Sequence, residues 1–289
     1  MKKSTPYFLL VPALLFTIFV LVYPLFQNLI NSFQDISLAY GTKGWIGFDN
    51  YFHILNDNLF WLAFKNTALY AIVGTVCSLL VGLGIALLLN IRIGRINNIF
   101  KFIYTIPWVI SPVVAGFAWK WLLNDNFGIV NYWLTQLGII KEGITWLGSA
   151  DTALLCVIVA RIWQFFPFAM VIFVAGLQTI PQEQYEAADV DGASSIKKFI
   201  HITLPNLQSV IGVLLLLGII WSFNDFNMVF VMTRGGPIYS SMVLSVLVRE
   251  FSFMHFDLGK GAALSILIFS LLISLSFIYL KVLAKKENS

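Results

Sequence analysis

Charged side chains are scarce in this sequence. Of its 289 residues, 11% are Asp, Glu, Lys or Arg and 59% are hydrophobic, whereas an ordinary soluble domain carries roughly a quarter charged residues. A soluble enzyme, a nucleic-acid-binding domain and a disordered scaffold all need more polar surface than 18 basic and 14 acidic side chains provide. The scarcity excludes those classes and indicates an integral membrane protein.

Cysteine, histidine and the common catalytic motifs are also rare or missing. Cys77 and Cys156 lie inside apolar runs, which excludes a disulfide framework and a thiolate metal site. The histidines, His53, His201 and His255, are far apart in the sequence, so we expect no metal site. The sequence has no G-x-x-x-x-G-K-[ST] phosphate loop, no G-x-S-x-G and no H-E-x-x-H. We therefore expect no catalytic residue and no cofactor in this chain.

Long apolar runs are what the sequence has in abundance. A helix needs about 20 mostly apolar residues to cross a bilayer, and long runs without two-residue alternation favour helices over barrel strands. Six runs meet this length: Phe8–Ile30, Asn66–Leu89, Phe102–Leu122, Thr152–Leu177, Ser209–Val231 and Gly261–Leu280. The predicted fold class is all-α, a polytopic membrane helix bundle with six transmembrane helices in one domain, residues 1–289.

The positions of Lys and Arg predict the orientation of the bundle. With six spans both termini lie on one side, and that side carries the denser set of basic residues: Lys2, Lys3, Arg92, Arg95, Lys101, Lys197, Lys198, Lys281, Lys285 and Lys286. Because cytoplasmic loops are enriched in Lys and Arg, this side is predicted to be cytoplasmic. The net charge of +4 is then a topology signal and requires no nucleic-acid partner. We interpret the first run as an uncleaved anchor, since it is too long for the apolar region of a typical signal peptide.

The longest predicted cytoplasmic loop, residues 178–208, has the pattern of two short helices. Thr179 and Gln182 have capping-box spacing, and Gly192 can adopt the positive φ that ends a helix. Asp191, Ser194 or Ser195 can cap a second helix, which we expect to end before Pro205. The acidic first half disfavours an anionic lipid surface, so docking to a cytoplasmic protein is the preferred interpretation, with a membrane-surface helix as the alternative.

This loop resembles the EAA motif of the permeases of binding-protein-dependent ABC importers. All seven defined positions match at the family's spacing: Glu186, Ala187, Ala188, Gly192, Ile202, Leu204 and Pro205, with Asp189 inside the same stretch. Weaker likenesses to the carbohydrate-type subgroup cover nearly the whole chain, among them Gly47–Tyr51, Trp163, Pro167–Phe168 and Ala175–Gln178. The sequence is most similar to the maltose and glycerol-phosphate permeases, and to their F-type more than their G-type subunit.

The resemblance implies a fold, a function and partners. The loop would form two coupling helices that seat in a cytoplasmic ATPase, with Glu186 engaging the ATPase, Ala187 and Ala188 permitting close contact, and Gly192 making the turn. The partners implied are a second homologous permease, two copies of the ATPase with ATP and Mg, and an extracytoplasmic solute-binding protein. The solute would be a sugar, an oligosaccharide or a glycerol-phosphate-like molecule, taken up by alternating access across a bacterial or archaeal cytoplasmic membrane.

Polar residues inside the spans are candidates for a solute pathway, because such groups usually face a cavity or a partner. Arg161 and Asp225 lie at comparable predicted depths in spans four and five, and we expect them to approach one another or to line the same cavity. The candidate pathway residues are Arg161, Trp163, Gln164, Trp221, Asn224 and Asp225. Helix packing is the alternative role for the charged pair, and in such heterodimers the partner permease can hold the sugar.

Gly235, Gly236 and Pro237 follow span five on the external side. This sequence favours a tight turn, and the resemblance suggests that the turn reaches toward the pathway mouth or the binding protein; a simple turn is the alternative. Two other functional classes remain as rivals. An ion-driven secondary transporter commonly has internal inverted repeats, and an intramembrane enzyme needs a nucleophile–base or metal constellation; neither pattern is recognisable in the sequence.

Overall fold

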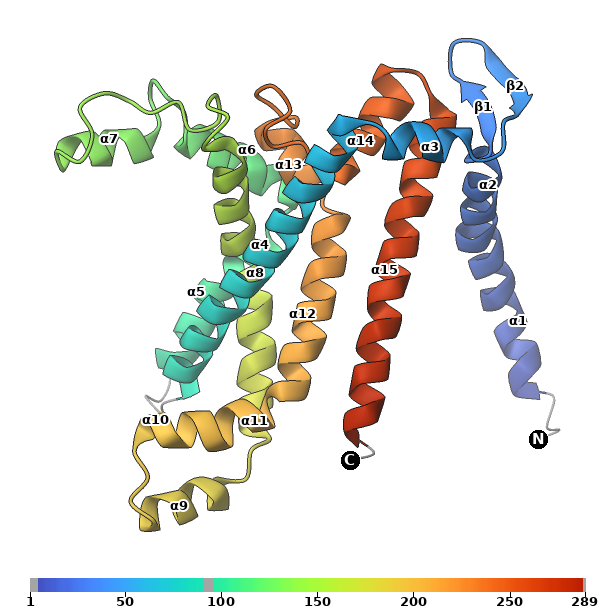
Figure 1. The fold of residues 1–289 in the computed structure, drawn as a ribbon. Helices are drawn as coiled ribbons and strands as arrows, with labels where there is room; N and C mark the ends of the chain where they lie inside the picture. Colours follow the sequence, from blue (N-terminus) through green and yellow to red (C-terminus); the bar gives the residue numbers. More distant parts are fainter. Residues whose placement is uncertain (1–4, 91–95, 288–289) are drawn as a thin grey trace. The chain divides into compact units, whose positions relative to one another are not determined.

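A computed structural model describes residues 5–90 and 96–287, and the chain divides into two compact units (Figure 1). One unit contains residues up to 61 and from 244 onward, and the other contains residues 62–243. The regular structure of the described residues is helical apart from one two-stranded sheet, which confirms the all-α prediction. Lys2, Lys3, Arg92 and Arg95, on which the predicted orientation partly depends, lie outside the described residues.

The first unit begins with an apolar span of consecutive helical segments. These are α1 (Thr5–Thr17), a π-helical turn (Ile18–Val22) and α2 (Tyr23–Asn31). The candidate span covers Leu10–Asn31, and none of its most apolar stretch is buried within the chain. An apolar helix with so little cover from its own chain is suited to lipid or to a partner helix.

A hairpin and a short helix follow this span in the first unit, and polar contacts join them. A hairpin of β1 (Gln34–Ser37) and β2 (Gly41–Trp45) is followed by α3 (Asp49–Leu55). The buried Asn50 amide donates to the Ser32 and Gln34 carbonyl oxygens, both at 3.0 Å. These bonds hold α3 against the start of the hairpin.

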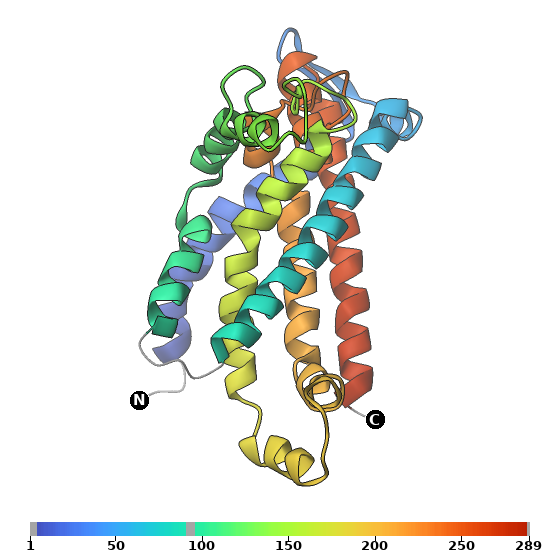
Figure 2. The same cartoon turned by 90° about the vertical axis from the view of Figure 1, so that its left-hand side faces the viewer.

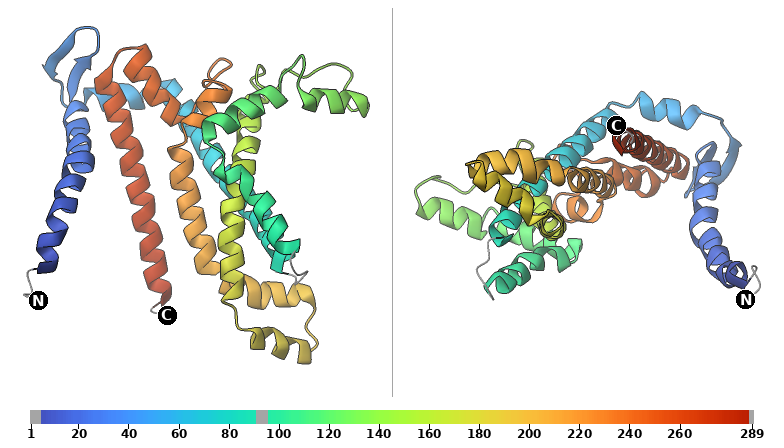
Figure 3. Two further views of the ribbon diagram at one scale, coloured as in Figure 1. Left: turned by 180° about the vertical axis from the view of Figure 1, so that it is seen from behind. Right: turned by 90° about the horizontal axis from the view of Figure 1, so that it is seen from below.

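The first unit ends with α14 (Leu244–Arg249), a π-helical turn (Glu250–Met254) and α15 (Leu258–Glu287). Gly259 lets α15 approach the hairpin, because a Cβ there would lie 2.3 Å from the Gln34 carbonyl oxygen. Helix α15 packs along α2, and α1 begins at the same end of the unit at which α15 finishes (Figure 3).

The second unit contains most of α4 and the helices that follow it (Figure 2). Its helices are α4 (Asn58–Asn90), α5 (Ile96–Val109), α6 (Pro112–Leu122), α7 (Ile129–Gln136), α8 (Ala153–Gln178), α9 (Gln182–Val190), α10 (Ser195–Lys198), α11 (Leu204–Asn206), α12 (Gln208–Phe223) and α13 (Asn227–Met232). Helix α8 contacts α5, α6, α12 and α13, so it is the central element of this unit.

Small residues allow the helices of the second unit to approach one another closely. A Cβ at Gly82 of α4 would lie 2.9 Å from the backbone nitrogen of Met170 in α8, and one at Gly218 of α12 would lie 2.4 Å from Thr75 Cγ2 in α4. Small residues at helix crossings are typical of membrane bundles, where association depends on close packing. These two glycines bring α4 into contact with both α8 and α12.

Within the described residues, four helices are long and apolar enough to cross a membrane: Leu10–Asn31, Asn58–Asn90, Ala153–Gln178 and Leu258–Lys281. Two bent helix pairs raise the number to six if each pair is counted as one span. The four helices and the pair Ile99–Val109 with Pro112–Leu122 overlap five of the predicted runs. The other pair joins Ser195–Asn206 to Gln208–Phe223, so it overlaps only the first part of the predicted fifth run.

The predicted third span, Phe102–Leu122, is broken at its centre. Helix α5 ends at Val109, Ser111 has extended backbone angles, and α6 starts at Pro112 at 95° to the first part. The physical reason is visible in the sequence, because a proline forces the residue before it away from the helical region.

The predicted fifth span, Ser209–Val231, also fails to continue as one helix. Helix α12 ends at Phe223 and α13 starts at Asn227, after a break that contains Asn224 and Asp225. Asp and Asn compete for backbone hydrogen bonds and so favour caps over helix interiors. The break therefore places two polar side chains at a helix end within an apolar segment.

Candidate functional site

A pair of short helices extends from the lower end of the second unit in Figure 1, between α8 and α12. Helix α9 follows Pro181 and ends at Val190, and Gly192, two residues later, has a φ of +71°, which confirms the predicted turn. The Ala193 amide donates to the Ala188 carbonyl oxygen at 2.9 Å and the Gly192 amide to the Asp189 carbonyl oxygen at 3.1 Å. This is the bonding by which a left-handed glycine closes a helix.

The start of α9 differs from the predicted capping box. The Thr179 hydroxyl donates to the Gly176 carbonyl oxygen at the end of α8, and the Gln182 amide donates to Glu186 Oε1 at 2.8 Å. Thr179 therefore belongs to the end of the preceding helix, and Gln182 orients the Glu186 carboxylate on the surface of α9.

The second member of the pair is longer than predicted. The Ser194 hydroxyl caps α10 by accepting from the Lys197 amide at 3.4 Å. A π-helical turn, Phe199–Thr203, then joins α10 to α11, which continues through Pro205 to Asn206. The expectation that this helix ends before Pro205 was wrong, because the wider turn precedes the proline, which takes a first-turn position of α11 where its missing N–H is tolerated.

Polar bonds connect the two short helices, which we call the coupling pair (residues 182–206). Lys198 Nζ lies 2.6 Å from Asp189 Oδ1, and the Asn206 amide donates to Gln184 Oε1 at 3.0 Å. The Tyr185 and Thr203 hydroxyls share a 2.9 Å hydrogen bond. The pair is thus held together at three places and behaves as one structural element.

The coupling pair is anchored to the bundle at its base. Tyr185 and Ile202 pack against the core cluster that contains Leu177 of α8 and Leu207. Leu207 is fully buried, and a Cβ at Gly176 would lie 2.8 Å from its Cδ2 atom. The base of the pair therefore packs directly on the adjoining ends of α8 and α12.

The far surface of the coupling pair is exposed and partly apolar. Val190 is 89% exposed and Ile196 71% exposed, and Glu186 and Ala187 are exposed beside them, with Ala188 half-buried. These side chains therefore have little cover from the rest of the described chain.

A second polar site lies at the break between α12 and α13. The buried Tyr70 of α4 donates its hydroxyl proton to Asp225 Oδ2 at 2.6 Å, and Asp225 Oδ1 accepts from the Met228 amide at 3.3 Å. Arg161 of α8 also approaches α4, because a Cβ at Gly74, one turn after Tyr70, would lie 3.4 Å from Arg161 Cγ. Tyr70 thus joins α4 to the helix break at Asp225. The expected approach of Arg161 to Asp225 stays a prediction.

Arg161 itself is enclosed by helix packing. Its side chain is 7% exposed, its guanidinium lies 4.5 Å from the Phe165 ring centroid, and its Nε and Nη2 atoms have no hydrogen-bond partner among the described residues. A buried guanidinium over an aromatic face gains cation–π stabilisation. The Arg161 side chain is therefore packed in the interior of the second unit.

Gln164 connects α8 to the other helix break. Its buried amide donates to the carbonyl oxygen of Ile110 at 3.1 Å, one of the residues between α5 and α6. A carbonyl released by a helix break needs a partner inside a membrane, and Gln164 supplies it. Both breaks in the second unit are therefore fixed by polar side chains from neighbouring spans.

The remaining candidate residues differ in their exposure. Trp163 is half-buried in edge contact with Trp119. Trp221 is 40% exposed and packs against Phe168, which in turn contacts Trp108 at 5.4 Å between ring centroids. Asn224 is also exposed and follows Trp221 by three residues in the sequence. The aromatic surface of Trp108, Phe168 and Trp221 joins three helices.

The external turn has an unusual backbone. Arg234, Ile238 and Tyr239 all have positive φ angles, and Gly236–Pro237 is a cis peptide. Non-glycine residues at positive φ are strained and persist where surrounding bonds impose them.

Two hydrogen-bonding side chains hold this turn. The Ser241 hydroxyl contacts Thr233 Oγ1 and the Gly236 carbonyl oxygen, and the Asn66 amide donates to the Ser240 and Met242 carbonyl oxygens. Ile238 stands out of the turn with 91% exposure. The turn is therefore a fixed element that presents one apolar side chain.

Comparison with known proteins decides the family. The family described as "Binding-protein-dependent transport system inner membrane component" matches residues 78–287, which include the coupling pair and both helix breaks. The chain belongs to this family. It is a permease, the membrane subunit of an ABC importer, and a translocation subunit with no enzymatic role of its own.

Individual relatives match the permease over nearly its whole length. The sulfoquinovosyl glycerol transport system permease protein SmoG of Agrobacterium fabrum is 35% identical, over 96% of this chain and 90% of the relative. The trehalose/maltose transport system permease protein MalF of Thermococcus litoralis is 33% identical, over 96% of this chain and 92% of the relative. A bacterial ABC transporter involved in the import of the acidic polysaccharide alginate has the same fold, with a TM-score of 0.83, 20% identity, and coverage of 97% and 96%.

Several residues of the permease site were not among the predicted candidates. Tyr70 and Trp108 lie in apolar runs where an aromatic residue is ordinary, so no local signal distinguishes them, and Phe168 was noted only as part of the family likeness. Tyr185 lies three residues after Gln182, within the acidic half of the loop, and its role depends on Thr203, eighteen positions away. Only Pro112 carried a visible signal, because a proline predicts the helix break at which Gln164 donates to the Ile110 carbonyl oxygen.

Proposed function

We propose that this permease takes up a sugar or an oligosaccharide. Two of its relatives are named as transport proteins for sulfoquinovosyl glycerol and for the disaccharides trehalose and maltose. A sugar site commonly combines aromatic faces with a few amide or charged groups. The exposed rings of Trp221 and Trp108, with Asn224 on the same helix end as Trp221, fit this chemistry.

In this proposal the pathway residues have two roles. Trp221 and Asn224 contact the solute directly, because they are exposed. Arg161, Gln164 and Asp225 fix the two helix breaks that shape the pathway wall, and Trp163 packs behind them. The external turn of Gly235, Gly236 and Pro237 faces the extracytoplasmic binding protein and presents Ile238 to it.

We further propose that ATP hydrolysis on two copies of a separate cytoplasmic ATPase drives the transport cycle. The coupling pair carries this proposal, because it is exposed on its far surface and anchored to α8 and α12 at its base. Closure of the ATPases moves the pair through contacts at Glu186, Ala187, Ala188 and Asp189. The motion passes by way of Ile202, Leu204 and Pro205 to the spans, a rigid-body switch between two states.

The assembly also needs a second, homologous permease, against which the exposed surfaces of the spans pack. Both termini lie in the cytoplasm, a placement supported by the common end of α1 and α15 in the first unit and by the basic residues of the tails. ATP and Mg bind to the ATPase subunits only.

A size change at Ala187 tests the coupling proposal. Ala187 is exposed, so Ala187→Trp should leave the permease folded and abundant while the larger side chain holds the ATPase away. We expect transport and transport-coupled ATP hydrolysis in proteoliposomes to fall severely. Ala187→Ser is the matched control and should remain active, because it hardly changes the side-chain volume. Full coupling in the Trp variant would show that no subunit approaches this surface.

A further inference from the structure

Helix α7 lies at the end of the second unit opposite to the coupling pair and runs across the direction of α8 (Figure 1). It is eight residues long and ends at Gln136, and Gly138, two residues later, has a φ of +69°. The amide of Gly138 donates to the Thr135 carbonyl oxygen and that of Ile139 to the Leu134 carbonyl oxygen, both at 3.0 Å. The chain then returns toward α8.

The orientation of α7 is fixed by one buried amide. Asn131 donates to the Asp125 and Ile144 carbonyl oxygens at 3.2 and 3.0 Å, and its Oδ1 accepts from the Ile144 amide and from Trp146 Nε1. Two donors and two accepted bonds use the full capacity of an Asn side chain. The loop on either side therefore holds α7 in one rotational position.

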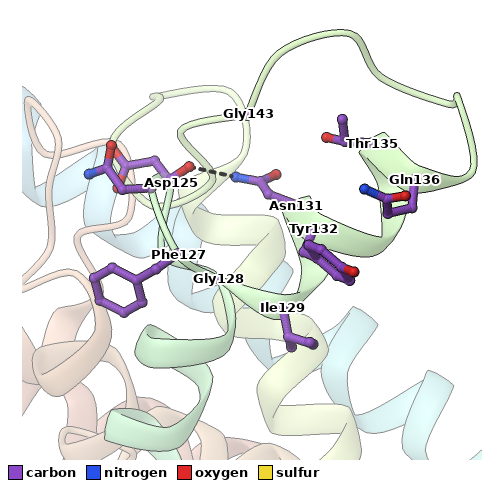
Figure 4. Close-up of a pocket in the computed structure, with 10 residues that line it drawn as sticks. Asp125, Phe127, Gly128, Ile129, Asn131, Tyr132, Thr135, Gln136 and Gly143 are labelled. Carbon is purple, nitrogen blue, oxygen red and sulfur yellow. Dashed lines mark hydrogen bonds between the residues drawn. The ribbon is translucent and has the colours of Figure 1, made fainter.

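The other residues of α7 are exposed or half-buried, and the exposed ones differ around the helix. One side is apolar except for Gln136, which lies at the C-terminal end of the helix, two turns after Ile129. Trp133 is 58% exposed, with Tyr132 and Ile129 exposed near it. Thr135 is also exposed but lies two residues from Trp133, nearly opposite to it around a helix of 3.6 residues per turn. Figure 4 shows Ile129 on the side of α7 toward the spans and Thr135 on the other side.

The apolar side of α7 continues an exposed apolar stripe on α6. Val114, Phe117 and Trp121 are exposed at helical spacing along α6, which is half of a bent candidate span. The Trp121 ring contacts Phe127 at 6.2 Å between centroids, and Phe127 leads into α7. Further exposed apolar residues follow the helix: Leu137 and Ile139.

We propose that α7 is an interfacial anchor that lies in the external leaflet of the bilayer, with Ile129, Tyr132 and Trp133 among the lipid headgroups and upper acyl chains. Trp and Tyr are enriched at the boundary between hydrocarbon and water, and a short helix with one apolar side lies in that plane. The continuity with the α6 stripe places α7 at the level where that span leaves the membrane.

The surrounding charges are of both signs, with Lys120 and Lys141 close in sequence to Asp125 and Glu142. A mixed set gives no net attraction to anionic headgroups. Burial of apolar area therefore holds the anchor in place, and its binding is insensitive to salt and to the fraction of anionic lipid.

Two labels on opposite sides of α7 test this inference. A nitroxide is attached at Trp133→Cys or Thr135→Cys in a permease whose Cys77 and Cys156 are replaced by Ala, and the assembled transporter is placed in lipid nanodiscs. Collisions with oxygen report lipid, and collisions with a water-soluble nickel chelate report solvent. We expect the label at 133 to collide mainly with oxygen and the label at 135 mainly with nickel, at low and high salt alike.

Three results would overturn the anchor. Equal access of both labels to nickel would place α7 in solvent. Protection of the label at 133 from both reagents would mean that another subunit, not lipid, covers this side. Loss of the lipid signal in about 0.5 M salt, where the Debye length is on the order of a few Å, would replace apolar burial by electrostatic attraction and so contradict the stated cause.

Discussion

The bond between Tyr70 and Asp225 is a short polar contact across the second unit, and its removal has a predictable effect. Tyr70→Phe deletes only the hydroxyl that donates to Asp225 Oδ2 at 2.6 Å, so the volume of the fully buried ring is kept. A hydrogen bond to a charged group contributes about 1.5–3 kcal/mol in soluble proteins, and polar pairs in membrane proteins average about 0.6 and reach about 1.7 kcal/mol. We therefore expect a loss of about 1–2 kcal/mol.

Such a loss corresponds to a measurable change in melting temperature. For large domains each kcal/mol lowers the melting temperature by about 2–4 °C, so the purified complex should melt about 2–8 °C lower. Tyr279→Phe is the matched control, because the Tyr279 hydroxyl has no hydrogen-bond partner within the part of the chain that the structure describes. This control should melt as the unchanged protein does.

A double-mutant cycle separates the bond from other effects of the two residues. Asp225→Asn keeps an oxygen that can accept from the Met228 amide but removes the charge that strengthens the Tyr70 bond. We expect Tyr70→Phe to cost much less when it is combined with Asp225→Asn than in the unchanged protein. Effects that add to within about 0.3–0.5 kcal/mol would refute the reasoning that this bond holds the helix break.

Two further substitutions test the packing and the pathway. Gly218→Ala places a Cβ 2.4 Å from Thr75 Cγ2, so it should destabilise the complex by about 1–3 kcal/mol, and Thr75→Ala should restore the melting temperature; a Gly218→Ala complex that melts normally would contradict the close helix crossing. Trp221→Ala should lower the uptake of a sugar delivered by the binding protein without lowering permease abundance, whereas Trp121→Ala, an exposed aromatic on another helix, should leave uptake unchanged. Equal uptake by both variants would remove Trp221 from the solute pathway.

The spans and the coupling pair could be predicted from the sequence because both depend on local patterns. About twenty apolar residues are sufficient to identify a span, and Gly192 identifies a turn without reference to any distant residue. The bend at Ser111 and the break at Asn224 were not predicted, because the spans were identified from their average hydropathy. Hydropathy averaged over a span is unaffected by one extended residue or by two polar ones, even though Pro112 and Asp225 each carry a local signal.

The connections between spans could not be predicted in this way. Tyr70 meets Asp225 across 155 positions, and Gln164 meets Ile110 across 54. Neither partner is specified by its neighbours in the sequence, and a polar residue in an apolar run indicates only that some partner exists. Arg161 and Asp225 could be assigned similar depths from the sequence, but depth alone did not identify Tyr70 as the residue that bonds to Asp225.

Transmission of force through the coupling pair requires the ATPase to lie next to it. The most direct test therefore identifies the neighbour of the pair in the assembled transporter. A photo-crosslinking amino acid at Val190, which is 89% exposed at the end of α9, is compared with one at Ile238, similarly exposed in the external turn. The account predicts that position 190 forms an adduct with the ATPase, in a yield that changes when ATP is added, and that position 238 forms none with the ATPase. Adducts at position 190 with lipid alone, or with the ATPase in a yield that nucleotide does not alter, would contradict it.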